Sequence, residues 1–215
     1  MKTALQKACL YGICDLGYLT MAQAVPVSRQ LLEGGVGILQ LRAKGHDPVG
    51  LLPLARELKI LCDEFKVPFV VNDHLELARE SEAHALHLGQ DDGSLSEARE
   101  FLAQGVLVGR STHSLDQAKA ALEEGADYIG FGPLFPTPTK KGRPGIGLSE
   151  IADMHAAVGS QIPAFCIGGI KPENLDEVLA AGAQRVVIVS HLLTAADVRS
   201  STADIIKILS NSKTL

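Results

Sequence analysis

Cysteine is scarce in this sequence, and its placement excludes two common kinds of site. None of the four cysteines belongs to a CxxC pair, and no histidine and cysteine residues share the spacing of a zinc site. Three of them lie within apolar runs, where cysteine is a small buried side chain. We therefore expect free thiols in a reducing compartment, and neither structural zinc nor a disulfide framework.

Long apolar segments and an excess of positive charge are also missing. No apolar run approaches the length of a membrane span. A net charge of −5 with histidine neutral argues against nucleic acid or an acidic membrane as partner. A secretory leader over residues 1–24 is not expected, because Gln6, Lys7 and Asp15 interrupt its apolar stretch. We expect a cytoplasmic protein; small anionic molecules and a homo-oligomer both remain open as partners.

The sequence does contain a regular alternation of two kinds of segment. Apolar residues make up 46% and charged residues 21%, as is usual in globular proteins. Eight short, near-continuously apolar runs are typical of parallel strands covered on both faces. They are Leu10–Cys14, Val36–Leu41, Pro68–Val71, Ala83–Leu88, Val106–Gly109, Tyr128–Phe131, Ala164–Ile167 and Val186–Val189.

Segments with helical periodicity lie between these runs. The clearest are Val49–Glu64, Leu95–Ala103, Leu115–Glu124, Pro172–Ala181 and Ala196–Leu209. Alternating strands and helices predict a parallel sheet, either closed or open. No GxGxxG motif opens the first helix, which weakens the dinucleotide-binding open sheet. We expect an α/β fold, a (β/α)8 TIM barrel in which residues 1–215 form one catalytic domain.

Polar and glycine residues gather at the carboxyl end of every predicted strand. That is the end at which barrel enzymes build their active sites. The residues concerned are Asp15, Arg42, Lys44, Asn72, Asp73, residues 89–92, Arg110, Ser111, residues 130–132, Gly168, Gly169 and Ser190.

Cationic and amide side chains follow the second predicted strand. Side chains alternate along a strand, so Gln40, Arg42 and Lys44 should point the same way. Arginine offers a fork of donors and lysine a point charge, the combination that phosphate recognition uses. The alternative interpretation is a solvated strand end.

Two carboxylates follow the third and fourth strands. Asp73 and Asp92 would end neighbouring strands of a barrel, about 4.8 Å apart, and could share one cation. Mg²⁺ takes one or two carboxylates together with substrate phosphate and water. Asp91 could replace Asp92 as a ligand. The alternative interpretation is a pair of helix N-caps.

The long segment 132–145 follows the sixth strand. It is rich in proline, glycine, threonine and cations, and such loops are usually lids or binding loops rather than mobile surface. Thr137, Thr139 and Lys140 offer donors to an oxyanion. Gly168 and Gly169, together with the Val189-Ser190 pair, occupy the position of the common phosphate site of barrels.

Two histidines lie at or just past strand ends. His87 and His113 are the candidates for a chemical role. Ser111 precedes His113 by two residues, a couple that suggests nucleophilic catalysis. No GxSxG elbow is present, so acyl transfer is set aside.

Taken together, the motifs resemble the thiamine-phosphate synthase family. The stretches that carry the resemblance are LYGICD (10–15), QLRAK (40–44), VND (71–73), HLGQDD (87–92), GRSTHS (109–114), DYIGFGPLFPTPTK (127–140), IGGI (167–170) and VIVS (187–190). They appear in family order from the first strand to the last, and the GQxD and FPTxTK patterns are the specific ones.

The resemblance implies a transferase that joins hydroxymethylpyrimidine diphosphate to a thiazole phosphate, or to its carboxylated form, and releases pyrophosphate. By motif, Gln40, Arg42, Lys44 and Asn72 would bind the pyrimidine diphosphate, and Asp73 and Asp92 would hold Mg²⁺. Ser111 and Lys140 would contact pyrophosphate, with Arg42 as a further catalytic residue. Thr137, Thr139, Gly169, Val189 and Ser190 would hold the thiazole phosphate, and His87 falls in the pocket.

The chain departs from the family pattern at three places. Cys14 stands where threonine is usual, His84-Ala85 where Asp-Gly is commoner, and His191 where a small residue is usual. These departures put pocket detail in doubt. Two alternatives stay open: a thiazole tautomerase using His113 as acid and base, and a non-catalytic barrel that binds a phosphate ligand.

Overall fold

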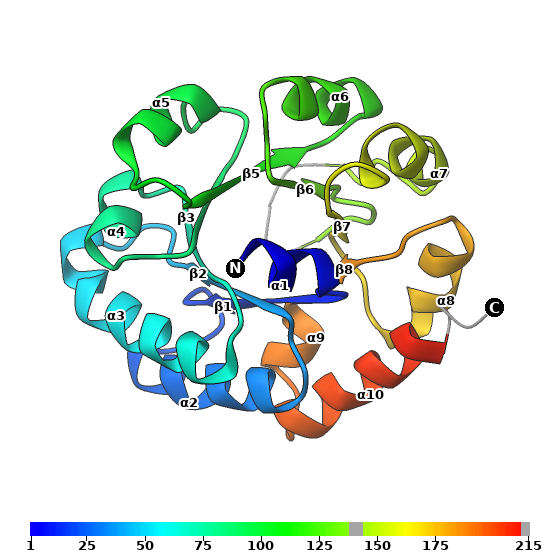
Figure 1. The fold of residues 1–215 in the computed structure, drawn as a ribbon. Helices are drawn as coiled ribbons and strands as arrows, with labels where there is room; N and C mark the ends of the chain where they lie inside the picture. The colour runs from blue at the N-terminus through cyan, green and yellow to red at the C-terminus, as the bar shows by residue number, and fades with distance from the viewer. Residues whose placement is uncertain (138–143, 212–215) are drawn as a thin grey trace.

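Eight parallel strands close into a barrel in chain order, with β8 pairing with β1 (Figure 1). This computed structural model describes residues 1–137 and 144–211. The strands are β1 (Leu10–Asp15), β2 (Ile38–Arg42), β3 (Phe69–Asn72), β4 (Ala85–Leu88), β5 (Leu107–Thr112), β6 (Tyr128–Phe131), β7 (Ala164–Ile167) and β8 (Val186–Val187). The predicted (β/α)8 barrel is confirmed, and the open sheet is excluded.

Helices surround the strands on the outside of the barrel (Figure 1). They are α2 (Met21–Glu33), α3 (Pro48–Phe65), α4 (Leu75–Glu80), α5 (Leu95–Phe101), α6 (Leu115–Glu123), α7 (Ile151–Met154) with the π-helical turn η2 (His155–Gly159), α8 (Pro172–Ala180), α9 (Ser190–Leu193) and α10 (Val198–Asn211). The five helices predicted from periodicity all appear, with each end within two residues of the expected one.

Strand β5 is the strand that differs most from its predicted bounds. Its carboxyl end continues to Thr112, because Gly109–Thr112 pair with Tyr128–Phe131 of β6. Ser111 is therefore a strand residue, held in the sheet, and not part of the loop that follows.

Alternate residues of the strands point into the barrel and fill its lower part. These inward residues form one buried cluster with two residues from the amino-terminal segment: Leu5, Ala8, Tyr11, Ile13, Ile38, Val70, Ala85, Leu107, Tyr128, Phe165 and Val187. The short helix α1 (Lys2–Lys7) lies across the amino-terminal end of the barrel (Figure 1). Its Leu5 contributes to this cluster, so the lower end of the barrel is filled and a ligand must enter from the other end.

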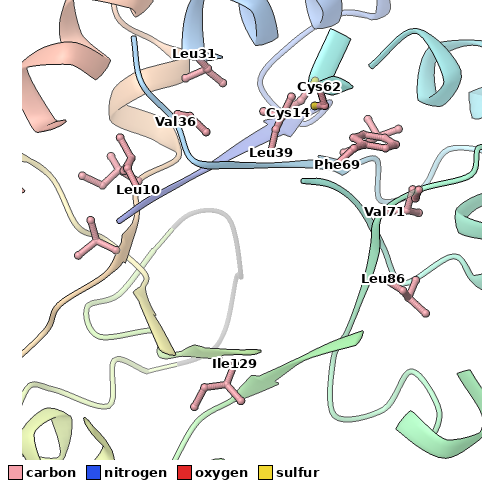
Figure 2. Close-up of a cluster of buried hydrophobic side chains, with 14 of the residues drawn as sticks. Leu10, Cys14, Leu31, Val36, Leu39, Cys62, Phe69, Val71, Leu86 and Ile129 are labelled. Carbon is pink, nitrogen blue, oxygen red and sulfur yellow. The ribbon is translucent and has the colours of Figure 1, made fainter. Parts of the chain in front are cut away.

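The other strand residues point outward and pack against the helices. Figure 2 shows this layer, with Leu39, Phe69, Val71 and Leu86 directed from the strands toward the surrounding helices. The four cysteines form no disulfide, as expected, and all but Cys9 are buried. Among residues 1–137 and 144–211, none of the helices combines the length and the apolar character that a membrane crossing requires.

Two residues of α3 test how much the outer layer stabilises the barrel. Leu58 is fully buried against the strands, whereas Ile60 on the same helix is 61% exposed. We expect Leu58→Ala to lower the free energy of unfolding by about 2–5 kcal/mol, because it removes buried contacts and leaves a cavity. Ile60→Ala should change it by less than about 1 kcal/mol. Urea denaturation of both variants measures the difference, and equal losses would contradict this packing.

Candidate active site

A cavity opens at the carboxyl ends of the barrel strands. It holds about 860 Å³ of empty space, a figure that includes the solvent in its open mouth. Nine of the residues that the family resemblance assigns to the site line it: Gln40, Arg42, Asn72, His87, Ser111, Thr137, Gly169, Val189 and Ser190. Lys44, Asp73 and Asp92 are not part of this lining. Thr139 and Lys140 lie outside the described residues.

Arg42 is held in the cavity wall by a carboxylate that the sequence did not single out as a site residue. One guanidinium nitrogen of Arg42 donates to Asp15 Oδ2 at 2.7 Å, and the Asp15 side chain is only 1% exposed. The other oxygen of Asp15 accepts from the backbone of Gly17 at 2.9 Å. The pair fixes the direction of the arginine, so its charge faces the cavity at a set position.

Asp73 and Asp92 come together at the ends of β3 and β4, as the strand order predicts. Their carboxyl groups are hydrogen-bonded, and burial, followed by the presence of Asp92, raises the pKa of Asp73. Lys44 Nζ lies 3.2 Å from Asp73 Oδ2 and acts in the opposite direction. The alternative interpretation of the two aspartates as helix N-caps is wrong, because His74 and Ser94 are the N-caps of α4 and α5.

Arg110 braces the loop that carries Asp92. Its guanidinium donates to the carbonyl oxygens of Gly89 and Gly93 at 2.7 and 2.9 Å. Within the same loop, Asp92 Oδ2 accepts from the Gly89 backbone at 2.8 Å. Arg110 is only 6% exposed, so this cation organises the protein and does not face a ligand. The sequence did not indicate that Arg110 is buried on β5, because it resembles the other polar residues found at strand ends.

Gly169 lies where two loops approach closely at the other side of the cavity. Its φ is +66°, and a Cβ atom built there would come within 2.7 Å of Phe135 Cβ. The backbone of Phe135 in turn donates to the carbonyl oxygen of Gly168 at 3.1 Å. The loop after β6, which carries Thr137, is thereby fixed against the loop after β7 by a contact that glycine alone permits.

A chain of buried polar side chains forms the floor of the cavity. His87 Nε2 lies 2.9 Å from Ser111 Oγ, and His87 Nδ1 lies 3.3 Å from the hydroxyl of Tyr128. Tyr128 in turn contacts Tyr11, which accepts from the amide of Gln40 at 2.8 Å. The sequence reasoning missed both tyrosines, although their inward strand positions follow from period-two alternation.

His113 also lines the cavity, and its Nδ1 contacts the carbonyl oxygen of Gly132. Its backbone donates to Gln117 Oε1 at 2.8 Å. The ring is thus anchored to the start of the loop after β6, in the same cavity as Ser111 and His87.

Known proteins resemble this chain over most of its length. The family model described as thiamine monophosphate synthase matches residues 10–192. The chain belongs to the thiamine monophosphate synthase family. The resemblance drawn from the strand-end motifs is confirmed, and the predicted function, thiamine-phosphate synthesis by a transferase, is confirmed at the level of the family.

Individual relatives of this family agree. A thiamine-phosphate synthase of Bacillus cereus (strain AH187) is 41% identical over 86% of this chain and 86% of its own length. One of Thermus thermophilus is 45% identical over 79% of this chain and 81% of its own. One of Nostoc is 42% identical over 80% of this chain, which spans 48% of that relative's length.

A solved structure shows the same agreement in three dimensions. The thiamine phosphate pyrophosphorylase of Pyrococcus furiosus matches with a TM-score of 0.86 and 31% identity, over 98% of both chains.

The three departures from the family pattern lie away from the cavity lining. Cys14 points outward from β1 into the layer beneath the helices, as Figure 2 shows. His84 lies before β4, where its ring accepts from the Phe69 backbone at 3.0 Å and approaches Asp63 at 3.1 Å. His191 is in α9, next to Ser190, and is not among the lining residues. None of them replaces a residue that faces the cavity.

The close approach at Gly169 can be tested against a glycine of similar conformation. Gly125 has φ +85°, and a Cβ atom there would meet nothing within 4 Å. Gly125→Ala should cost about 1 kcal/mol of stability from backbone strain alone. Gly169→Ala adds a clash with Phe135, so we expect a clearly larger loss, about 2–4 kcal/mol. Urea denaturation compares the two; equal losses would mean that the loops do not meet as described.

Proposed function

We propose that this cavity condenses 4-amino-2-methyl-5-hydroxymethylpyrimidine diphosphate with 4-methyl-5-(2-phosphoethyl)thiazole to give thiamine phosphate and pyrophosphate. The observation that supports it is the division of the cavity wall into two unlike halves. The ends of β2 to β5 carry amides, a fixed arginine and, at the rim, two carboxylates. The ends of β6 to β8 offer backbone groups and hydroxyls. Two anionic substrates of different chemistry suit two such halves.

The first half fits the pyrimidine diphosphate. Gln40 is 3% exposed and lies deep in the barrel, whereas Arg42 and Lys44 stand progressively nearer the rim. A substrate bound with its pyrimidine ring against Gln40 and Asn72 would extend its diphosphate toward the two cations. Amide groups both donate and accept, as an aminopyrimidine requires. His87 completes the wall of this half.

The second half fits the phosphate of the thiazole. Thr137 and Ser190 bring hydroxyl groups, and Gly169 and Val189 bring backbone to the same side of the cavity. The loops after β7 and β8 are the usual phosphate-binding place in barrels. Thr139 is assigned to this half from its motif alone. Lys140 is assigned from its motif to the pyrophosphate.

The donor set at the rim fits Mg²⁺. Asp73 and Asp92 are hard oxygen donors held against each other, and mutual repulsion of two carboxylates favours a cation between them. Within residues 1–137 and 144–211, no three acidic, histidine or cysteine side chains gather as a metal site. A two-carboxylate set is what Mg²⁺ uses when a substrate diphosphate supplies the remaining ligands. When bound, Mg²⁺ would supply positive charge that stabilises the leaving pyrophosphate.

The reaction requires that the leaving pyrophosphate is stabilised and that the two substrates are aligned. The bond between the pyrimidine methylene and the diphosphate oxygen breaks, the electron pair leaves with pyrophosphate, and the thiazole nitrogen forms the new bond to the methylene. Arg42, Ser111 and Lys140 would donate to the departing anion, and no strong protein base is needed. Holding both substrates in one cavity aligns nitrogen and carbon and limits access of water.

The two alternatives from the sequence receive less support. His113 does line the cavity, as a tautomerase would require. However, the paired carboxylates at the rim have no role in a proton transfer that needs no metal. A non-catalytic barrel would be expected to lack one of the charged ligands, and both aspartates and Arg42 are in place. A single domain over residues 1–215 and a cytoplasmic location remain predictions, as does any homo-oligomer.

A turnover assay tests the proposed function. The protein is mixed with both substrates, with and without Mg²⁺, and the release of pyrophosphate and the formation of thiamine phosphate are followed. We expect both products in equal amounts, and only with Mg²⁺. Absence of product in both conditions would reject the synthase. Conversion of a thiazole tautomer by the same sample, lost in His113→Asn, would then support the tautomerase.

Replacing one carboxylate tests the metal site. Asp92→Asn keeps an oxygen that can accept from the Gly89 backbone, so the loop should keep its form while the ligand charge is lost. We expect kcat/KM to fall by about 100-fold or more at saturating Mg²⁺, since one charged metal ligand is missing. Asp204→Asn, on the exposed face of α10, is the matched control and should change kcat/KM less than twofold. Similar rates in both variants would show that Asp92 is no ligand.

A further inference from the structure

The polar chain beneath the cavity crosses the barrel interior from β2 to β5. Its order is Gln40, Tyr11, Tyr128, His87 and Ser111, with successive distances of 2.8, 3.4, 3.3 and 2.9 Å. Tyr128 is completely buried, and the two tyrosines and Gln40 are at most 3% exposed. Tyr128 is not part of the cavity lining, so its hydroxyl must find its partners among its protein neighbours.

The site is shaped to hold the ring of Tyr128. A Cβ atom at Gly109, on the neighbouring strand β5, would come within 2.2 Å of that ring. Tyr11 packs edge-on to Phe165 with ring centroids 5.3 Å apart, and Phe165 also packs edge-on to Tyr128 at 6.2 Å. The ring of Tyr128 is therefore held by its neighbours, and the hydrogen of its hydroxyl group is left with few directions.

The directions of the hydrogen bonds can be assigned by starting at Gln40, at one end of this hydrogen-bond chain. The amide nitrogen of Gln40 donates to Tyr11 Oη, and we take the hydrogen of Tyr11 to be directed to Tyr128 Oη. In this arrangement Tyr128 accepts from Tyr11 and would give its own hydrogen to His87 Nδ1, which lies 3.3 Å away. A neutral histidine whose Nδ1 accepts carries its proton on Nε2, which then donates to Ser111 Oγ. Ser111 accepts from the histidine, and its hydroxyl hydrogen can turn toward the cavity that Ser111 lines.

We infer that Tyr11 and Tyr128 are positioning residues, which hold His87 as the Nε2-protonated tautomer and thereby direct the hydroxyl of Ser111 toward the leaving group. This inference rests on the proposed function, in which Ser111 donates to the departing pyrophosphate. It adds that the amide against the pyrimidine ring and the hydroxyl at the pyrophosphate are the two ends of one hydrogen-bond chain. The hydroxyls of the two tyrosines act only through their neighbours.

The tautomer can be measured without any turnover. Protein labelled with ¹⁵N in its seven histidines is examined by NMR, and His87 is assigned by its loss in His87→Asn. We expect Nδ1 of His87 to be unprotonated and Nε2 to be protonated at neutral pH. In Tyr128→Phe the two nitrogens should move toward a mixture of tautomers. Tyr18→Phe, the remaining tyrosine, is the matched control and should leave the signals unchanged. A protonated Nδ1 in the unaltered protein would overturn the inference.

A double-mutant cycle tests the effect on the reaction. Tyr128→Phe should lower kcat about tenfold, the cost of one misdirected hydrogen bond to a charged group, while KM for the thiazole phosphate stays within twofold. In the Ser111→Ala background the same change should lower kcat less than twofold, because the hydroxyl it directs is absent. Tenfold losses in both backgrounds would show a general packing defect and reject the inference.

The two measurements separate this inference from the proposed function. If the unaltered protein forms no thiamine phosphate, the proposed function fails, and the NMR result still decides the tautomer. If it does form product and Tyr128→Phe behaves like Tyr18→Phe in both experiments, the inference fails alone. Circular dichroism of Tyr128→Phe checks that the barrel is intact, and Tyr11→Phe, one bond further from His87, should show the same NMR change to a smaller extent.

Discussion

Closure of eight parallel strands decides what each inward side chain of this protein contacts. In a closed barrel every second residue of every strand points into the same small volume, and no strand has a free edge. The lower part of that volume is filled by apolar side chains and sealed by α1. The upper part is the open cavity, whose lining combines polar side chains with glycines and apolar residues such as Ile13 and Ile167. The candidate site exists because the barrel is filled from one end only.

Barrel closure also brings charged side chains close together at the carboxyl ends of the strands. Arg42 is fixed by a nearly buried carboxylate, and two further carboxylates meet at the rim beside Lys44. Burial, and after it the neighbouring Asp92, raises the pKa of Asp73, so the doubly ionised pair is disfavoured without a cation. A cation bound between the two carboxylates would relieve that repulsion. The fold therefore holds these groups in place for a cation and an anionic substrate before either binds. Arg110 and the Gly168–Gly169 turn then fix the loops that carry these groups.

Much of the fold could be predicted from local patterns. The run Val36–Leu41 predicted β2 to within two residues at each end, and the periodic segment 49–64 predicted α3 to within one, since strand and helix periods leave distinct apolar patterns. The carboxyl end of β5 could not be placed, because Arg110 and Ser111 are polar and only pairing with β6 keeps them in the sheet. For the same reason Ser111 was expected just after the strand and not within it. The aspartates were assigned correctly to neighbouring strand ends, but only the three-dimensional structure excluded their use as caps.

The sequence by itself determined the order of strands and helices, the face on which the site lies and the family to which the chain belongs. Those properties depend on residue type and on spacing along the chain, both of which can be read directly from the sequence. Only the tertiary structure decided that Tyr11 and Tyr128 join Gln40 to Ser111, that Asp15 directs Arg42, and that Cys14, His84 and His191 do not line the cavity. These contacts join residues far apart in the chain, and their geometry is set by barrel closure and close packing rather than by any neighbour in sequence.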